Sequence, residues 1–153
     1  MAQNLIYSIN GPVVTIKGKT GLSMMEMVHV GNDHLVGEVI RMDEELTTIQ
    51  VYEETSGLAP GEPVTTTGGP LCVTLGPGIL RNIYDGIQRP LPEIRALTGE
   101  TISRGVQVAA LNREKKWEFN PVAEPGQHVD AGDVLGTVQE TSAILHKIMV
   151  PPG

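Results

Sequence analysis

Short apolar runs, each closed by a turn signal, fill the first half of this chain and restrict what it can fold into. Gly, Pro, Asn and Asp separate the runs about every 8–12 residues, a spacing typical of all-β sandwiches and barrels. We expect a barrel, because closure removes the exposed strand edges that promote aggregation. The predicted strands lie at 5–9, 13–16, 24–30, 35–42, 47–52, 64–67 and 71–75.

The composition supports such a fold and disfavours several classes of partner. Among 153 residues, 18 Gly and 11 Pro suit tight turns, and a 3% aromatic content leaves Val, Ile, Leu and Met to build the core. The formal net charge of −7 disfavours binding to nucleic acid and to anionic lipid. No apolar run approaches the roughly 20 residues that span a bilayer. We therefore expect no nucleic-acid partner, no membrane insertion and an intracellular location.

Cys72 is the only cysteine, so no intramolecular disulfide and no cysteine-based metal site can form. Its apolar neighbours Leu71 and Val73 predict a buried structural thiol rather than a reactive one.

A different pattern follows at 78–87, where four apolar residues fall near one helical face: Ile79, Leu80, Ile83 and Ile87. This spacing predicts a helix of about two turns. The following sequence Arg89-Pro90-Leu91-Pro92 predicts an extended connection, because a residue before proline avoids helix. We place a domain boundary here, between a barrel at 1–90 and a second β-rich domain at 91–153.

The second half is also predicted to be all-β. Strands are expected at 106–111, 117–119, 134–138 and 144–150, and no amphipathic helix separates them. The predicted fold class is therefore all-β, with a small N-terminal barrel, a second β-rich domain and one short helix between them.

Several motifs suggest catalysis, and each fails on its own requirements. Gly18-Lys19-Thr20 ends like a phosphate-binding loop, but Val13 stands where that loop needs a glycine. Gly76 and Gly78 open a dinucleotide fingerprint whose third glycine is replaced by Arg81. The four histidines lack metal-ligand spacing, and no nucleophile elbow occurs. We expect no catalytic, cofactor-binding or metal-binding residue.

The acidic residues of the first half are interpreted as solvated turn carboxylates, since adjacent Glu53 and Glu54 point to opposite faces of a strand. The others in this group are Asp43, Glu44, Glu45 and Glu62. Arg89 has two interpretations. In the first, its guanidinium bridges domains or subunits through a bidentate carboxylate contact. In the second, which we favour, it has a structural role within the chain as an exposed charge that covers Pro90.

Three segments of the second half resemble the barrel-sandwich of biotinyl and lipoyl carrier domains: PGQHV at 125–129, AGDVLGTV at 131–138 and IMVPPG at 148–153. Those domains present a modified lysine at a hairpin tip. Lys147 is the lysine of this region, but it lies inside an apolar run and lacks the flanking residues typical of carriers. We interpret the similarity as architectural, and keep a carrier with a modified Lys147 as the alternative function.

Four segments stand together in one order: VGEVIRM at 36–42, IQVYEETSGLAPGEPV at 49–64, LGPGIL at 75–80 and YDGIQRPL at 84–91. In this order and spacing they resemble the N-terminal part of the catalytic A subunit (alpha chain) of V-type and A-type rotary ATPases. The candidates that this resemblance singles out for structural or interface roles are Gly57, Gly61, Gly76, Gly78, Gly86, Arg89 and Pro90.

The resemblance implies a division of labour. Residues 1–90 would belong to a crown of barrels that holds alternating A and B subunits together, and 91–153 would begin the bulge without completing it. The nucleotide site would lie further along the polypeptide, so ATP and Mg would bind the full-length protein and not this fragment. The full complex couples ATP hydrolysis or synthesis to proton or sodium transport.

The resemblance also implies partners and a location. The partners would be B subunits and subunits of the peripheral and central stalks, and the location would be cytoplasmic and peripheral to the membrane. Apolar surface exposed on an excised ring subunit is expected to promote self-association of the fragment.

Overall fold

The computed structural model describes residues 4–101 and 103–152. Contacts divide the chain into two compact units, which we describe separately. The first comprises Met1–Val73 and Ile94–Gln107, and the second comprises Thr74–Glu93 and Val108–Gly153.

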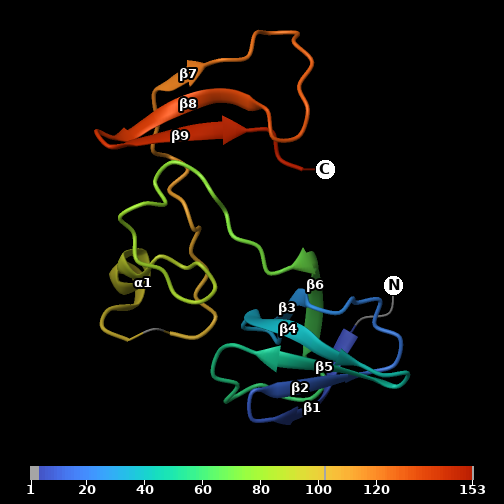
Figure 1. Cartoon of the computed structure of the whole chain (residues 1–153). Coiled ribbons are helices and arrows are strands. Elements are labelled where there is room, and N and C mark those ends of the chain that lie inside the picture. Colours follow the sequence, from blue (N-terminus) through green and yellow to red (C-terminus); the bar gives the residue numbers. More distant parts are fainter. Residues whose placement is uncertain (1–3, 102, 153) are drawn as a thin grey trace. The chain divides into compact units, whose positions relative to one another are not determined.

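The first unit contains a closed six-stranded antiparallel barrel (Figure 1), in the order β1-β2-β5-β4-β3-β6. This confirms the predicted all-β class and the predicted barrel. Closure comes from the pairing of the first strand with the last, Asn4 with Val64 and Leu5 with Pro63. The strands are β1 (Asn4–Asn10), β2 (Val13–Lys17), β3 (Glu26–Val30), β4 (Leu35–Met42), β5 (Leu46–Val51) and β6 (Pro63–Pro70).

Alternation of buried and exposed side chains along these strands builds the barrel core. In β3, for example, Val28 and Val30 are fully buried, whereas His29 between them is only half-buried. The core is aliphatic, as the composition requires: Ile6, Val14, Ile16, Leu22, Val28, Val30, Leu35, Val39, Ile49, Val51 and Val64. A buried carboxylate on β3, that of Glu26, accepts hydrogen bonds from the Ser23 N–H and the Thr66 hydroxyl.

The seventh strand predicted at 71–75 is wrong. β6 continues through Gly68 and Gly69 to Pro70, and no strand follows at 71–75. A barrel already closed by six strands has no free edge for a seventh. The buried thiol predicted in this segment is also wrong, because Cys72 is exposed and Leu75 is 75% exposed.

The second unit contains a three-stranded antiparallel sheet in the order β7-β8-β9. Its strands are β7 (Phe119–Pro121), β8 (Val134–Thr141) and β9 (Ile144–Met149), close to three of the predicted strands. The strand predicted at 106–111 is wrong, because this segment is irregular. The Ala110 carbonyl accepts a hydrogen bond from the Tyr84 hydroxyl, at 3.1 Å, instead of one from a neighbouring strand.

The helix predicted at 78–87 is also wrong. Arg81 has a φ of 70°, which a right-handed helix does not accommodate, and residues 78–87 form turns instead. The single helix that the described residues form is α1 (Leu91–Thr98). It begins within the connection predicted to be extended at 89–92 and continues through 94–97, where the sequence pattern predicts neither a strand nor a helix. Pro92 lies in its first turn, where a proline removes no intrahelical hydrogen bond. The described part of the chain holds no helix long and apolar enough to cross a bilayer.

Shortening a side chain inside the barrel should lower the free energy of unfolding far more than shortening one on its outer face. Ile49 is fully buried, whereas Ile40 on the neighbouring strand β4 is 39% exposed. We expect Ile49→Ala to lower the free energy of unfolding by about 2–5 kcal/mol, because it leaves a cavity. Ile40→Ala is the matched control and should cost less than about 1 kcal/mol. Denaturant unfolding measures both, and equal losses would contradict the assigned barrel interior.

Candidate functional site

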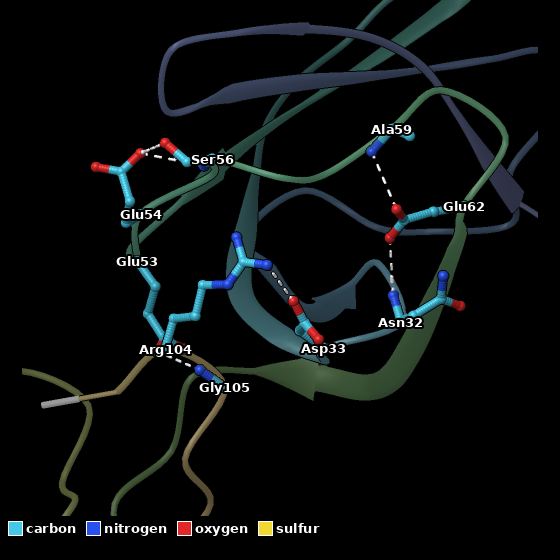
Figure 2. Close-up of polar contacts among 9 residues, drawn as sticks. All are labelled: Asn32, Asp33, Glu53, Glu54, Ser56, Ala59, Glu62, Arg104 and Gly105. Atoms are coloured by element: carbon cyan, nitrogen blue, oxygen red, sulfur yellow. Dashed lines mark hydrogen bonds and ion pairs between the residues drawn. The ribbon is translucent and has the colours of Figure 1, made fainter. Parts of the chain in front are cut away.

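Two loops meet at one end of the barrel: the turn at 31–34 between β3 and β4, and the segment at 52–62 between β5 and β6. Glu62 joins them (Figure 2). One oxygen of its carboxylate accepts the Asn32 N–H at 2.9 Å, and the other accepts the Ala59 N–H at 3.0 Å. The Gly31 N–H adds a bond to the Pro63 carbonyl at 2.8 Å. One side chain therefore holds the turn and the loop in a fixed arrangement.

Two more carboxylates of the same end are engaged by nearby groups. Glu54 accepts the Ser56 hydroxyl at 2.7 Å and the Ser56 N–H at 3.1 Å. The hydroxyl bond, followed by the backbone bond, lowers the pKa of Glu54 from its ordinary value. Glu53 accepts the Gly105 N–H at 2.9 Å.

Asp33 completes this polar cluster through an ion pair. The Arg104 Nη2 atom lies 2.6 Å from Asp33 Oδ2, and the two side chains are 35% and 48% exposed. Figure 2 shows the Arg104 side chain extending to the β3–β4 turn from a segment that lies far away in sequence.

The predicted glycines Gly57 and Gly61 both lie in the loop at 52–62. Gly57 has a φ of +91°, and a Cβ there would lie 2.9 Å from the Arg104 guanidinium. Gly61 has a φ of +92° and open space around it. Its N–H donates to the Ile6 carbonyl at 2.8 Å, which ties the loop to β1.

The other predicted residues lie in the second unit. Arg89 forms a bond from its Nε atom to Asp85 Oδ2 at 2.7 Å, with both side chains largely buried. Asp85 also accepts the N–H groups of Ile87 and Arg89, at 3.1 and 2.8 Å. Pro90 is fully buried and pairs with Tyr84 through an isolated bridge. Arg89 thus has a partner within its own unit, and its side chain is largely buried rather than the exposed charge that one interpretation of the sequence expects.

Opposing effects set the pKa of Asp85. Burial raises it, whereas the hydrogen bonds from the Arg89 backbone and guanidinium and from the Ile87 N–H lower it, and the net result is a pKa below the ordinary value.

Three predicted glycines remain, all in the second unit. A Cβ at Gly76 would lie 3.1 Å from Leu111, and one at Gly78 would lie 3.5 Å from Trp117. Gly86 has open space around it. A pocket of about 520 Å³ lies nearby, lined by the irregular segment at 109–113 together with Thr74, Pro77, Lys115 and Trp117. The Lys115 ammonium lies 4.0 Å from the centre of the Trp117 ring.

Comparison with known proteins identifies the family of this chain. Residues 6–68 match the ATP synthase alpha/beta family beta-barrel domain, and residues 108–153 match the ATP synthase alpha/beta subunit barrel-sandwich domain. The chain belongs to the ATP synthase alpha/beta family. Both matches agree with the resemblance drawn from the sequence.

Relatives within this family narrow the similarity to one kind of subunit. The chain is 55% identical over 147 residues to the A subunit of the A-type ATP synthase of Methanosphaera stadtmanae, and 58% identical over 148 residues to that of Methanopyrus kandleri. These alignments cover 96% and 97% of this chain and 25% of each relative. The V-type ATP synthase alpha chain of Acetivibrio thermocellus is 52% identical over 153 residues, which are 100% of this chain and 26% of that one.

The chain therefore spans about a quarter of the length of the curated relatives it matches. Among solved structures, the ATPase EscN of the enteropathogenic E. coli type III secretion system aligns with a TM-score of 0.53 at 22% identity. That alignment covers 58% of this chain and 21% of EscN, and at this identity it indicates a shared fold alone.

Sequence reasoning missed the residues that organise the barrel end. Glu53 and Glu62 are predicted to be solvated turn carboxylates, but both are half-buried and accept backbone N–H groups. The spacing of Glu62 three residues after Ala59 is the one local signal, since a short-range side-chain bond to the backbone stabilises turns at such spacings. Asp33 and Arg104 are 71 residues apart, so no local pattern could pair them.

Removal of the Glu62 carboxylate should loosen the barrel end. A hydrogen bond to a charged group contributes about 1.5–3 kcal/mol. Glu62 accepts two, and because both are exposed, water replaces part of their contribution when the carboxylate is removed. We expect Glu62→Ala to lower the free energy of unfolding by about 1–3 kcal/mol, with Glu62→Gln losing less because it keeps one acceptor oxygen. Glu44→Ala, at an exposed turn carboxylate, should change it by less than about 0.5 kcal/mol. Denaturant unfolding measures the loss in each of the three variants. Equal losses in Glu62→Ala and Glu44→Ala would contradict the role given to the Glu62 carboxylate.

Stability of the second unit should fall in acid because of Asp85. A carboxyl whose folded-state pKa is depressed contributes stability above its unfolded pKa, here near 3.8, and loses that contribution as pH falls through the folded value. Trp117 is the only tryptophan and lies in this unit, so its fluorescence reports the transition. Asp85→Asn should reduce the acid dependence, whereas Glu114→Gln, at an exposed carboxylate, should leave it. An unchanged acid dependence in Asp85→Asn would exclude this group as its cause.

Proposed function

We propose that this chain is the N-terminal scaffold and assembly part of the catalytic A subunit of a V/A-type rotary ATPase. The observation that carries the proposal is the barrel match at 6–68 followed by the barrel-sandwich match at 108–153, in a chain 52–58% identical to A subunits or alpha chains over nearly all its length. In this proposal, 1–90 forms the barrel domain and 91–153 begins the bulge.

A scaffold role suits the chemistry of the barrel end. Its carboxylates accept backbone N–H groups or pair with Arg104, so they stabilise loops rather than present a reactive group. The described residues hold no group of three or more His, Cys, Asp or Glu side chains that could bind a metal ion. Loops and strand faces held in one shape are what a subunit needs to contact neighbours in a ring.

The partners in this proposal are the B subunits of the catalytic ring and the subunits of the peripheral and central stalks. The assembled complex would be peripheral to the membrane on its cytoplasmic side and would couple ATP hydrolysis or synthesis to proton or sodium transport. ATP and Mg would bind the full-length protein outside this chain. The geometry of Gly18 supports this placement, since its N–H donates to the Glu45 carbonyl at 2.8 Å. Residues 21–25 after Thr20 form a loop that leads into β3, in place of the helix that a phosphate-binding loop needs.

The carrier alternative has little geometric support. Lys147 lies within β9, opposite Thr137 of β8, whereas the turn of this hairpin lies at 142–143. A lysine that must be reached by a modifying enzyme is expected at the tip instead. Intact mass of the chain from a host with active biotin and lipoate ligases tests this alternative, which an adduct on Lys147 would support.

Assembly and nucleotide binding test the proposed function together. A catalytic A subunit from which residues 1–153 have been deleted should fail to form a ring with B subunits, because the ring would lose its crown of barrels. Native mass spectrometry measures ring formation. The chain by itself should show no binding of ATP with Mg²⁺ in calorimetry at micromolar concentrations. Ring formation without residues 1–153, or tight ATP binding by the chain alone, would contradict the proposal.

A further inference from the structure

Residues 103–106 lie against the barrel end although they come far later in the sequence than the loops that form it. The contacts are of three kinds. Arg104 pairs with Asp33 of the β3–β4 turn, and the Gly105 N–H donates to Glu53 beyond β5. The Gly57 Cα faces the Arg104 guanidinium so closely that a Cβ there would lie 2.9 Å from it. The turn and the loop thus contact this segment together.

The fit at Gly105 is close and specific. It has a φ of +71°, and an added Cβ would lie 2.5 Å from the Asp33 carbonyl oxygen. A side chain at this position would push the segment away from the turn, because the backbone carbonyl has little room to move. Arg104 and Gly105 therefore contact the same residue, one through its carboxylate and the other through its main chain.

The surface that receives this segment is held by contacts of its own. Glu62 bonds the turn at Asn32 to the loop at Ala59, and Thr55 donates its hydroxyl to the Gly11 carbonyl at 2.8 Å. None of these bonds involves residues 103–106. These bonds therefore hold the receiving surface without a contribution from residues 103–106.

Burial separates this segment from the barrel core. None of residues 103–106 is fully buried, and the ion pair is partly exposed on both sides. Opening the segment would therefore break polar contacts without exposing the aliphatic interior, which lies within the barrel. Such a segment opens locally, at a lower free energy than global unfolding.

We propose that residues 103–106 form a strap that docks on the loop end of the barrel, with the Asp33–Arg104 ion pair as its lock. The strap anchors the polypeptide just before the barrel-sandwich match begins at 108. The locked and open forms share one intact barrel, and ionic strength shifts the balance between them because the lock is an exposed pair of charges. This device is separate from the proposed scaffold function and stands without it.

Hydrogen exchange of the intact chain tests the strap. In Arg104→Ala, exchange of the Gly105 amide should speed up by about 10-fold or more, since a charge-assisted contact and the docking it supports are lost. Exchange in β2 and β5 should stay as in the parent chain. Arg95→Ala is the matched control, because Arg95 pairs with Glu100 at 2.5 Å with side chains 71% and 83% exposed. It should leave the Gly105 amide unchanged.

Charge and shape variants add independent readouts. Salt should speed Gly105 exchange in the parent chain but not in Arg104→Ala, and the double variant Asp33→Arg with Arg104→Asp should restore protection lost in either single variant. Gly105→Ala should release the strap, whereas Gly99→Ala should not, because Gly99 has a similar φ of +79° but open space around it.

Two results would overturn the proposal. The first is an Arg104→Ala chain whose Gly105 amide exchanges as slowly as in the parent chain. The second is equal loss of protection at Gly105 and in β2 and β5, which would make the segment part of the barrel's cooperative unit. Asp33→Asn, which keeps the shape of the turn residue, distinguishes these results if Arg104→Ala does not fold.

Discussion

Closure of the barrel depends on a short seam between the first strand and the last, and Glu62 stands at its end. Within the described residues, two pairs join β1 to β6 by strand pairing, Asn4 with Val64 and Leu5 with Pro63. The Ile6 N–H then donates to the Glu62 carbonyl at 2.9 Å, while the Glu62 side chain holds the loops of the same barrel end. One residue thus extends the seam with its main chain and fixes the loops with its carboxylate. Loop-closure entropy opposes a seam between partners this far apart in sequence.

The strands of the barrel were predictable because their determinants are local. Alternating aliphatic residues and Gly/Pro turns carry the same information in any context, and β4 and β5 appear within a residue or two of the predicted ranges. The helix was not predictable in the same way. The apolar spacing at 79–87 indicates a helix, but Asp85 captures the N–H groups of Ile87 and Arg89 and turns the chain instead. The actual helix begins beside Pro92, a residue interpreted as a helix breaker although the first helical turn tolerates it.

The polar cluster was beyond prediction for a different reason. Its partners are separated by 30 residues for Glu62 and Asn32, by 52 for Glu53 and Gly105, and by 71 for Arg104 and Asp33. Composition shows that the region is acidic but does not identify the partners of its carboxylates, because the closed fold determines which residues meet at such separations. A resemblance to a family was informative because it carries information about long-range contacts, which local patterns lack. Glu53 and Glu62, which the sequence pattern predicts to be solvated turn carboxylates, instead hold the loops of the barrel end.

The exposed thiol of Cys72 limits the disulfide chemistry open to this chain. Because the sequence has a single cysteine and the structure leaves it exposed, oxidation can join one chain to one other and then stops. Disulfide-linked oligomers larger than a pair are excluded by this count, whatever the oxidant. Any larger species formed from this chain under oxidising conditions must therefore contain contacts between chains other than disulfides.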